Sequence, residues 1–164
     1  MINVAFELTS EVCADLCQHR KIMVLHVDDD EGFLAVAKQC LEDQGQFQVD
    51  NANSVEEALE KLKKTEYDVV VADYQMPRKN GLELLKKLRQ EGNDIPFILF
   101  TCKGKEEIAL EALNSGVTQY IDKQGDAEST YEELKRSICK AVKRRRVTCS
   151  PKAMEEAQDM GFTC

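Results

Sequence analysis

Short apolar runs alternate along this chain with longer segments of helical periodicity. The runs are rich in β-branched or aromatic residues and end in polar or glycine-containing loops, which is typical of strands buried in a sheet. We predict five such strands, at residues 21–27, 47–50, 69–73, 95–100 and 117–121. Between and after them, apolar residues recur at helical spacing and predict five helices that begin near residues 33, 54, 82, 105 and 130.

Strict alternation of strands and helices with short loops indicates right-handed crossovers and a parallel sheet covered on both faces. The predicted fold class is therefore α/β, with a doubly wound five-stranded parallel sheet and five surrounding helices. One domain would occupy residues 21–146. Residues 1–20 would form an N-terminal extension and residues 147–164 a C-terminal tail, each with the pattern of one short helix.

Local signals predict where helices begin. Ser54-Val55-Glu56-Glu57 and Thr130-Tyr131-Glu132-Glu133 have the spacing of capping boxes, in which the first and fourth residues exchange hydrogen bonds between side chain and backbone. Asn80-Gly81 is a turn or helix-start signal. His26 lies inside the first apolar run, where we interpret it as a hydrogen-bonded strand residue rather than a catalyst.

Composition and charge narrow the classes of function. The chain has 164 residues, of which 43% are hydrophobic and 32% charged, so it can form one hydrophobic core. Its net charge of −8 argues against nucleic-acid binding, because phosphates would be repelled, and we interpret the basic run at residues 143–146 as a solvated helix end. No stretch approaches the roughly 20 apolar residues that cross a bilayer, and the first residues lack the pattern of a secretory signal. We therefore predict a cytoplasmic protein without a membrane partner.

The seven cysteines are an odd number and follow no disulfide framework, which is typical of a reducing compartment. Cys13, Cys17 and His19 could suggest zinc, but no second pair of ligands accompanies them. We predict no zinc site there.

The candidate chemistry lies at the ends of the predicted strands. The first strand ends in Asp28 and Asp29, the third in Asp73, the fourth in Thr101 and the fifth in Lys123. Ligands of open parallel sheets bind beyond these carboxyl ends. Neighbouring carboxylates repel one another unless a cation intervenes, and hard oxygen ligands suit Mg²⁺. An aspartate beside Mg²⁺, an ammonium and a hydroxyl is the set of groups that phosphoryl transfer to a carboxylate requires.

Four motifs occur in order along the chain: Val27-Asp28-Asp29; Asp73-Tyr74-Gln75-Met76-Pro77 followed by Asn80-Gly81; Thr101; and Tyr120-Ile121-Asp122-Lys123. With these motifs, residues 21–146 resemble the response-regulator receiver domains of two-component signalling, the CheY-like family. The resemblance implies the flavodoxin-like strand order 2-1-3-4-5. The sequence Lys123-Gln124-Gly125-Asp126 is similar to a variant of archaeal receivers.

The resemblance also implies a role for each site residue. Asp73 would accept a phosphoryl group from the phosphohistidine of a histidine kinase or phosphotransfer protein. Mg²⁺ would be held by Asp73, by Asp29, by Asp28 through water and by the backbone carbonyl of Gln75. Lys123 would pair with the phosphoryl group.

The same resemblance implies a switch. Thr101 would move toward the phosphoryl group and Tyr120 would turn inward behind it. This would repack the surface formed by the fourth helix, fifth strand and fifth helix, to which a downstream protein or a second copy of the chain would bind. The chain would assist its own phosphorylation and dephosphorylation without being a kinase, because no kinase histidine motif or ATP-binding segment is visible.

Two positions depart from the family pattern. Cys102 follows Thr101 where the family usually has Ala or Gly, and this larger side chain predicts slow hydrolysis of the phosphoryl group. Gln124 follows Lys123 where the family usually has Pro. We predict a trans peptide bond there, because a cis bond before a non-proline residue costs about 2.5–4 kcal/mol.

Four alternative functions fit parts of the pattern. A phosphatase of the haloacid-dehalogenase type also uses a strand-end aspartate with Mg²⁺, but it needs a second acid where Gln75 stands. A dinucleotide-binding domain needs a glycine-rich turn after its first strand, and residues 28–32 are mostly acidic instead. The chain could also be the receiver portion of a longer hybrid sensor kinase, or a non-phosphorylated pseudo-receiver that acts only through protein contacts.

Overall fold

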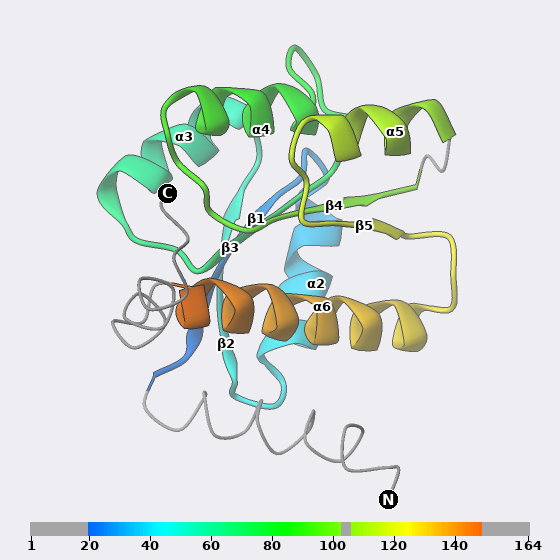
Figure 1. The fold of residues 1–164 in the computed structure, drawn as a ribbon. Helices are drawn as coiled ribbons and strands as arrows, with labels where there is room; N and C mark the ends of the chain where they lie inside the picture. The colour runs from blue at the N-terminus through cyan, green and yellow to red at the C-terminus, as the bar shows by residue number, and fades with distance from the viewer. Residues whose placement is uncertain (1–19, 103–105, 149–164) are drawn as a thin grey trace, which may run out of the picture.

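The computed structural model describes residues 20–102 and 106–148, which form a parallel sheet between two layers of helices (Figure 1). The strands are β1 Ile22–Val27, β2 Phe47–Ala52, β3 Val69–Ala72, β4 Phe97–Thr101 and β5 Gln119–Asp122. The helices are α2 Glu31–Glu42, α3 Val55–Lys64, α4 Gly81–Gln90, α5 Glu106–Asn114 and α6 Ala127–Thr148. The strand order β2-β1-β3-β4-β5 confirms the predicted doubly wound, flavodoxin-like α/β fold.

Two predictions about the ends of the chain lie outside the described residues. These are the short helices of the N-terminal extension and the C-terminal tail, and the group formed by Cys13, Cys17 and His19. They stay predictions.

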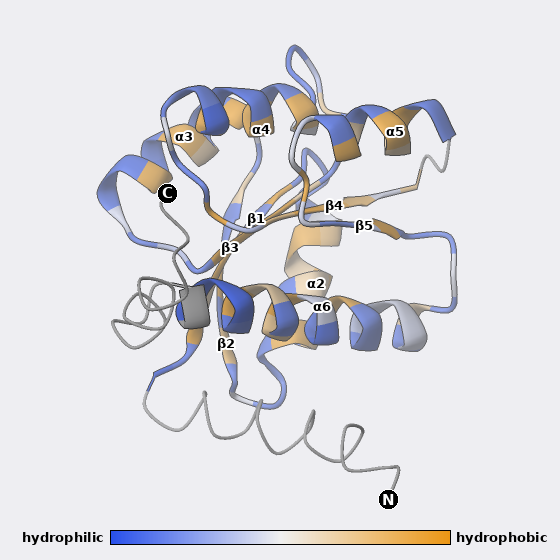
Figure 2. Cartoon of the chain, in the orientation of Figure 1, coloured by the Kyte–Doolittle hydropathy of each residue, from blue (hydrophilic) through white to orange (hydrophobic). Residues whose placement is uncertain are grey.

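Side chains along each strand alternate between the two helical layers. Val70 and Ala72 pack with α3, α4 and α5, whereas Val69 and Val71 pack with α2 and α6. All four are fully buried. Figure 2 shows the helices hydrophobic toward the sheet and hydrophilic on the outside. Because both faces of the sheet are covered, the central strands β3 and β4 are buried along their whole length, whereas the edge strand β2 alternates at its start, as the sequence predicted.

Backbone pairing aligns the carboxyl ends of the strands. Ala72 of β3 is the register partner of Val27 of β1. One residue further, the Asp73 N–H donates to the Val27 carbonyl, with an N···O distance of 2.9 Å. The Lys123 N–H likewise donates to the Thr101 carbonyl at 3.0 Å. The predicted strand-end residues therefore begin their loops at one edge of the sheet.

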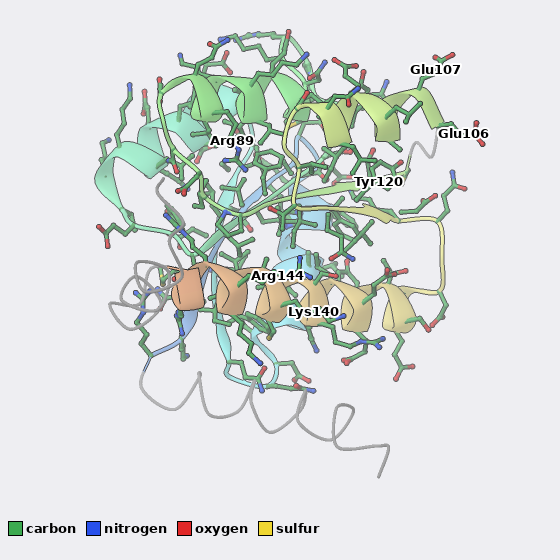
Figure 3. The ribbon with its side chains drawn as sticks, viewed as in Figure 1. Arg89, Glu106, Glu107, Tyr120, Lys140 and Arg144 are labelled. Carbon is green, nitrogen blue, oxygen red and sulfur yellow. The ribbon has the colours of Figure 1, made fainter. Side chains whose placement is uncertain are left out.

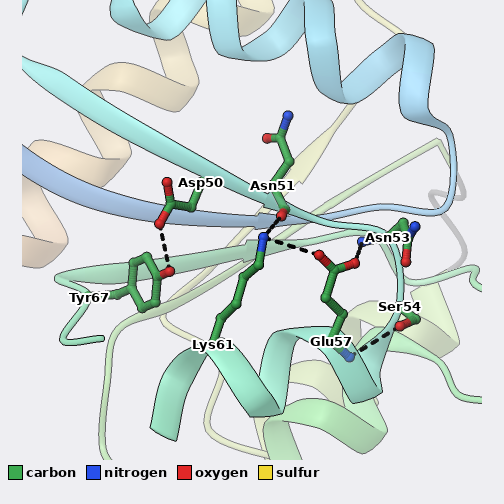
Figure 4. A network of polar contacts seen from close by, with 7 residues as sticks. All are labelled: Asp50, Asn51, Asn53, Ser54, Glu57, Lys61 and Tyr67. Carbon is green, nitrogen blue, oxygen red and sulfur yellow. Dashed lines mark hydrogen bonds and ion pairs between the residues drawn. The ribbon is translucent and has the colours of Figure 1, made fainter. Parts of the chain in front are cut away.

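The starts of α3 and α4 follow the predicted signals closely but not identically. Asn80 and Glu83 form a complete capping box at α4, with backbone-to-side-chain distances of 3.0 and 2.8 Å. At α3, the Ser54 hydroxyl accepts a hydrogen bond from the Glu57 N–H at 3.2 Å. The Glu57 carboxylate, however, accepts from the Asn53 N–H rather than from that of Ser54 (Figure 4). The predicted box at Ser54 is thus only half formed.

The predicted start of α6 at Thr130 is wrong. The helix begins at Ala127, and the Asp126 carboxylate accepts a hydrogen bond from the Ser129 N–H at 3.1 Å. Asp126 is also a favourable N-cap residue and comes earlier in the chain, so Thr130 is buried inside the helix. The helix continues to Thr148, past the predicted domain boundary at residue 146. Despite this length, no helix in the described part of the chain is both long and apolar enough to cross a membrane.

A polar network attaches the edge strand β2 to α3 and to the loop after it (Figure 4). Lys61 of α3 donates to the Asn51 backbone carbonyl and pairs with Glu57 at 3.1 Å. The Tyr67 hydroxyl donates to the Asp50 carboxylate at 2.7 Å. Burial, together with the Asp50 carboxylate, raises the pKa of Tyr67 to about 12, so this hydroxyl remains a donor at neutral pH. Among the described strands, β2 pairs with β1 alone, so these side chains add to its attachment.

A cavity of about 370 Å³ lies at the amino ends of β1 and β3, at the opposite edge of the sheet from Asp73. Its buried carboxylate, Asp68, accepts hydrogen bonds from Arg20 at 2.6 Å and from the Met23 N–H at 2.9 Å. Arg146 lies 3.6 Å from the same carboxylate. These charged groups pair with one another, and they join the start of β1 to the end of α6.

Candidate functional site

Three carboxylates meet at the carboxyl edge of the sheet. Asp28 and Asp29 follow β1 and Asp73 follows β3, and one oxygen of each lies within 4.8 Å of the others. Asp28 is only 2% exposed, Asp73 is half-buried and Asp29 is exposed. The structure thus brings together the three acids that the sequence predicted to converge.

The Lys123 ammonium lies between two of these acids. Its Nζ is 2.6 Å from the Asp28 carboxylate and 3.8 Å from that of Asp73. The Lys123 side chain is 9% exposed, so water solvates its charge poorly. Removing either partner of such a buried pair would leave the other charge uncompensated. Lys123 thus lies nearer to Asp28 than to Asp73. Its predicted pairing with a phosphoryl group on Asp73 stays a prediction.

Burial raises the pKa of Asp73 above its ordinary value. The Lys123 ammonium lowers this pKa, the Asp28 charge raises it, and hydrogen bonds from the Thr101 hydroxyl and the Gln75 backbone N–H lower it. Burial is the largest of these effects. The groups around Asp73 therefore offset the negative charge of its carboxylate only in part. A cation bound at the three acids would stabilise this charge.

The remaining predicted residues surround Asp73 in different ways. Thr101 is buried at the end of β4, and its hydroxyl donates a hydrogen bond to the Asp73 carboxylate. The Gln75 backbone N–H donates a hydrogen bond to the same carboxylate. The role of the Gln75 carbonyl as a metal ligand stays a prediction. Tyr120 of β5 is half-buried against the core under α3, α4 and α5, and burial raises its pKa (Figure 3).

The loops after β4 and β5 are joined by a hydrogen bond. The Gln124 side-chain amide donates to the Cys102 backbone carbonyl at 2.7 Å. The peptide bond between Lys123 and Gln124 is trans, as predicted. Cys102 itself is exposed beside Thr101.

Gly81 has a role that sequence reasoning missed. It is the first residue of α4, and a Cβ at this position would overlap the Asp73 carbonyl oxygen. The Gly81 N–H also donates to the Tyr74 carbonyl at 3.0 Å. The start of α4 therefore packs directly on the backbone that carries Asp73. The sequence indicated a helix start here, but this close approach depends on how α4 packs.

His26 differs from its sequence interpretation. It is fully buried on the face of the sheet that α2 and α6 cover, and its ring contacts that of Phe33 with centroids 5.8 Å apart. His26 lies in β1 as expected, but neither ring nitrogen has a hydrogen-bond partner among the described residues, so the expectation that its ring is hydrogen-bonded is wrong. Burial lowers the pKa of His26 to about 4, and the neutral imidazole fills the core as an aromatic ring.

A doubly wound parallel sheet with three acids, a buried ammonium and a hydroxyl at its carboxyl edge is the arrangement of domains in which a strand-end aspartate accepts a phosphoryl group. The chain belongs to the response regulator receiver domain family, which it matches over residues 24–135. It therefore contains a CheY-like receiver domain of two-component signalling.

Individual relatives agree with this assignment. The chain is 34% identical to the chemotaxis protein CheY-3 of Vibrio cholerae over 118 residues, which cover 71% of this chain and 91% of that protein. It is 30% identical to the transcriptional regulatory protein ZraR of Escherichia coli over 120 residues, which cover 73% of this chain and 27% of ZraR. The receiver domain of the Francisella response regulator 1452 superposes with a TM-score of 0.69 at 30% identity, covering 76% of this chain and 99% of that structure. These similarities do not favour the alternative functions considered from the sequence.

Substitution of Gly81 by Ala should destabilise the domain by roughly 1–3 kcal/mol, because the added methyl group overlaps backbone that cannot move without displacing Asp73. Urea unfolding followed by circular dichroism measures this change. Gly32→Ala is the matched control, since a Cβ there meets only the Asp30 carboxylate at 3.3 Å, a contact that a shift of a few tenths of an ångström relieves. Equal stability of the two variants would contradict the close packing at Gly81.

Substitution of Asp73 by Asn should raise the melting temperature at neutral pH in the presence of a chelator. A carboxyl group whose folded-state pKa is raised destabilises the fold while it is ionised, and this penalty disappears as the pH falls through that pKa. The advantage of Asp73→Asn should therefore shrink on acidification. Calorimetry of Asp73→Asn beside Asp94→Asn, an acid that is 87% exposed, tests this; a lower melting temperature for Asp73→Asn at neutral pH would contradict it.

Proposed function

We propose that this receiver domain accepts a phosphoryl group on Asp73 from the phosphohistidine of a histidine kinase or phosphotransfer protein. The observation that carries the proposal is the surroundings of the Asp73 carboxylate, where two further acids, a buried ammonium and a hydroxyl converge. An Asp73 oxygen would attack phosphorus as the bond from phosphorus to the histidine nitrogen breaks, and the released imidazole takes up a proton.

Mg²⁺ fits the donor set at this site. Asp29 and Asp73 would bind it directly and Asp28 through water, with the Gln75 backbone carbonyl as a further ligand. Carboxylate and carbonyl oxygens with room for water suit this ion, and no cationic side chain of residues 20–102 and 106–148 pairs with Asp29. When bound, Mg²⁺ neutralises the charge that develops on the transferring phosphoryl oxygens. The raised pKa of Asp73 supports this assignment, because burial destabilises the charged carboxylate even with the Lys123 ammonium 3.8 Å away.

Lys123 and Thr101 would respond to the new phosphoryl group. The Lys123 ammonium would shift from Asp28 toward the phosphoryl oxygens, a short movement because its Nζ already lies 3.8 Å from Asp73. The Thr101 hydroxyl would follow the charge, and Tyr120 would turn further into the space behind it. Charge added at Asp73 thereby biases the packing of β4 and β5, which is how a local modification becomes a change of surface.

The surface of α5, β5 and α6 is the proposed output region, which corresponds to the fourth helix, fifth strand and fifth helix of the sequence prediction. Its downstream partner would be another protein or a second copy of this chain in a homodimer. Exposed Glu106 and Glu107 on α5 and exposed Lys140 and Arg144 on α6 give the two helices opposite charge (Figure 3). In a dimer, the acidic helix α5 of one copy could therefore pair with the basic helix α6 of the other. We place this function in the cytoplasm, without nucleic-acid or membrane partners.

Incubation of the wild type with acetyl phosphate and Mg²⁺ should add one phosphate to the intact mass. The gain should disappear in Asp73→Asn and without Mg²⁺, because both the nucleophile and the neutralising cation are required. Asp94→Asn is the control and should be phosphorylated normally. A wild type that gains no phosphate would instead support a pseudo-receiver that acts through contacts alone.

Substitution of Cys102 by Ala should accelerate loss of the phosphoryl group several-fold, because a smaller side chain beside Thr101 gives water more room to approach phosphorus. The mass signal of phosphorylated protein is followed after acetyl phosphate is removed. Cys40→Ala, which changes a half-buried cysteine on α2, is the control. Faster decay in the wild type than in Cys102→Ala would refute this role of Cys102.

A further inference from the structure

The Lys123 ammonium contacts an aromatic ring as well as two carboxylates. Its Nζ lies 4.0 Å from the centre of the Phe33 ring and 5.3 Å from that of Phe100. An ammonium within about 6 Å of a ring centre is attracted by the negative face of the ring, and the attraction grows when water is excluded. Since Lys123 is 9% exposed, this contact is of the stronger kind.

Neighbouring groups fix the position of the Phe33 ring. Phe33 lies in the first turn of α2, where its backbone N–H donates to the Asp30 carboxylate at 3.0 Å. The edge of its ring meets His26 at an interplanar angle of 70°, and Phe100 packs at a centroid distance of 5.8 Å. His26 is neutral, so it adds no charge that would repel Lys123. The ring is thus a rigid surface at the side of the acidic cluster.

The ring and the carboxylates act on Lys123 in complementary ways. Carboxylates accept directional hydrogen bonds, and in this structure the ammonium is held by Asp28 at 2.6 Å. A ring face attracts the positive charge without requiring one donor direction, so the ammonium can turn its N–H groups from one acceptor to another while it remains over the ring. This is the property that a lysine needs if it is to change partners without leaving a buried site.

We propose that Phe33 is a positioning residue for Lys123, whose ring face retains the ammonium beside Asp73 while the ammonium exchanges Asp28 for the phosphoryl group. This inference rests on the proposed function of Asp73. It adds a residue outside the four sequence motifs, on a helix that contributes no other group to the site. It also explains why an aromatic side chain in the first turn of α2 is only half-buried and faces the acidic edge.

The rate of phosphorylation by acetyl phosphate at saturating Mg²⁺ tests the proposal. Phe33→Leu should slow the reaction about fivefold, which corresponds to roughly 1 kcal/mol of attraction between ring and cation. Phe33→Tyr keeps a ring and should retain most of the rate. Phe47→Leu is the matched control, because Phe47 is a buried phenylalanine of the same core far from Lys123. Should Phe33→Leu fail to fold, Phe33→Met provides a second non-aromatic variant.

Nuclear magnetic resonance tests separately whether the Phe33 ring lies over the Lys123 side chain. The ε-methylene protons of Lys123, assigned with a Lys123→Gln variant, should resonate upfield because of the ring current of Phe33. They should move downfield in Phe33→Leu but not in Phe47→Leu. An unchanged resonance, an unchanged rate in Phe33→Leu or equal slowing in both leucine variants would overturn the proposal. A wild type that takes no phosphate would instead refute the proposed function, and the resonance would then report only a packing contact.

Discussion

The concentration of negative charge at one edge of the sheet is the constraint on which the site depends. Three carboxylates lie within 4.8 Å of one another, and the buried Lys123 ammonium lies beside them, nearest to Asp28. Burial leaves Asp73 with a raised pKa, and the Lys123 ammonium does not offset the charge of all three acids. That deficit gives the site an affinity for a divalent cation and makes an arriving phosphoryl group change the balance of forces around it.

The rest of the fold maintains this unfavourable arrangement. Strand β3 is buried on both faces and pairs with β1 and β4, so its backbone is held on both sides of the site. Hydrogen bonds just beyond the strand ends fix the backbones of Asp73 and Lys123. Gly81 allows α4 to pack directly on the backbone of Asp73, and this packing holds Asp73 and its loop against the sheet.

Much of this could be predicted from the sequence, because apolar runs and helical spacing are local signals. The strand order and the convergence of Asp28, Asp73 and Lys123 follow from the resemblance and from the rule that parallel strands end at one edge. The predictions that were wrong or missing concern features that depend on competing capping signals or on tertiary packing. Two capping signals compete at the start of α6, and Asp126 precedes the predicted cap at Thr130. The contact of Phe33 with Lys123 depends on how the first turn of α2 lies against the loop that follows β5, which no spacing in the sequence reports.

Calorimetric titration with Mg²⁺ shows whether the clustered acids bind a divalent cation, and it requires no partner protein. We expect one saturable site in the wild type. Binding should be lost or strongly weakened in Asp29→Asn, since Asp29 is the exposed acid without a cationic partner among residues 20–102 and 106–148. A wild type that binds no Mg²⁺, or an Asp29→Asn variant that binds it as tightly, would refute the magnesium site.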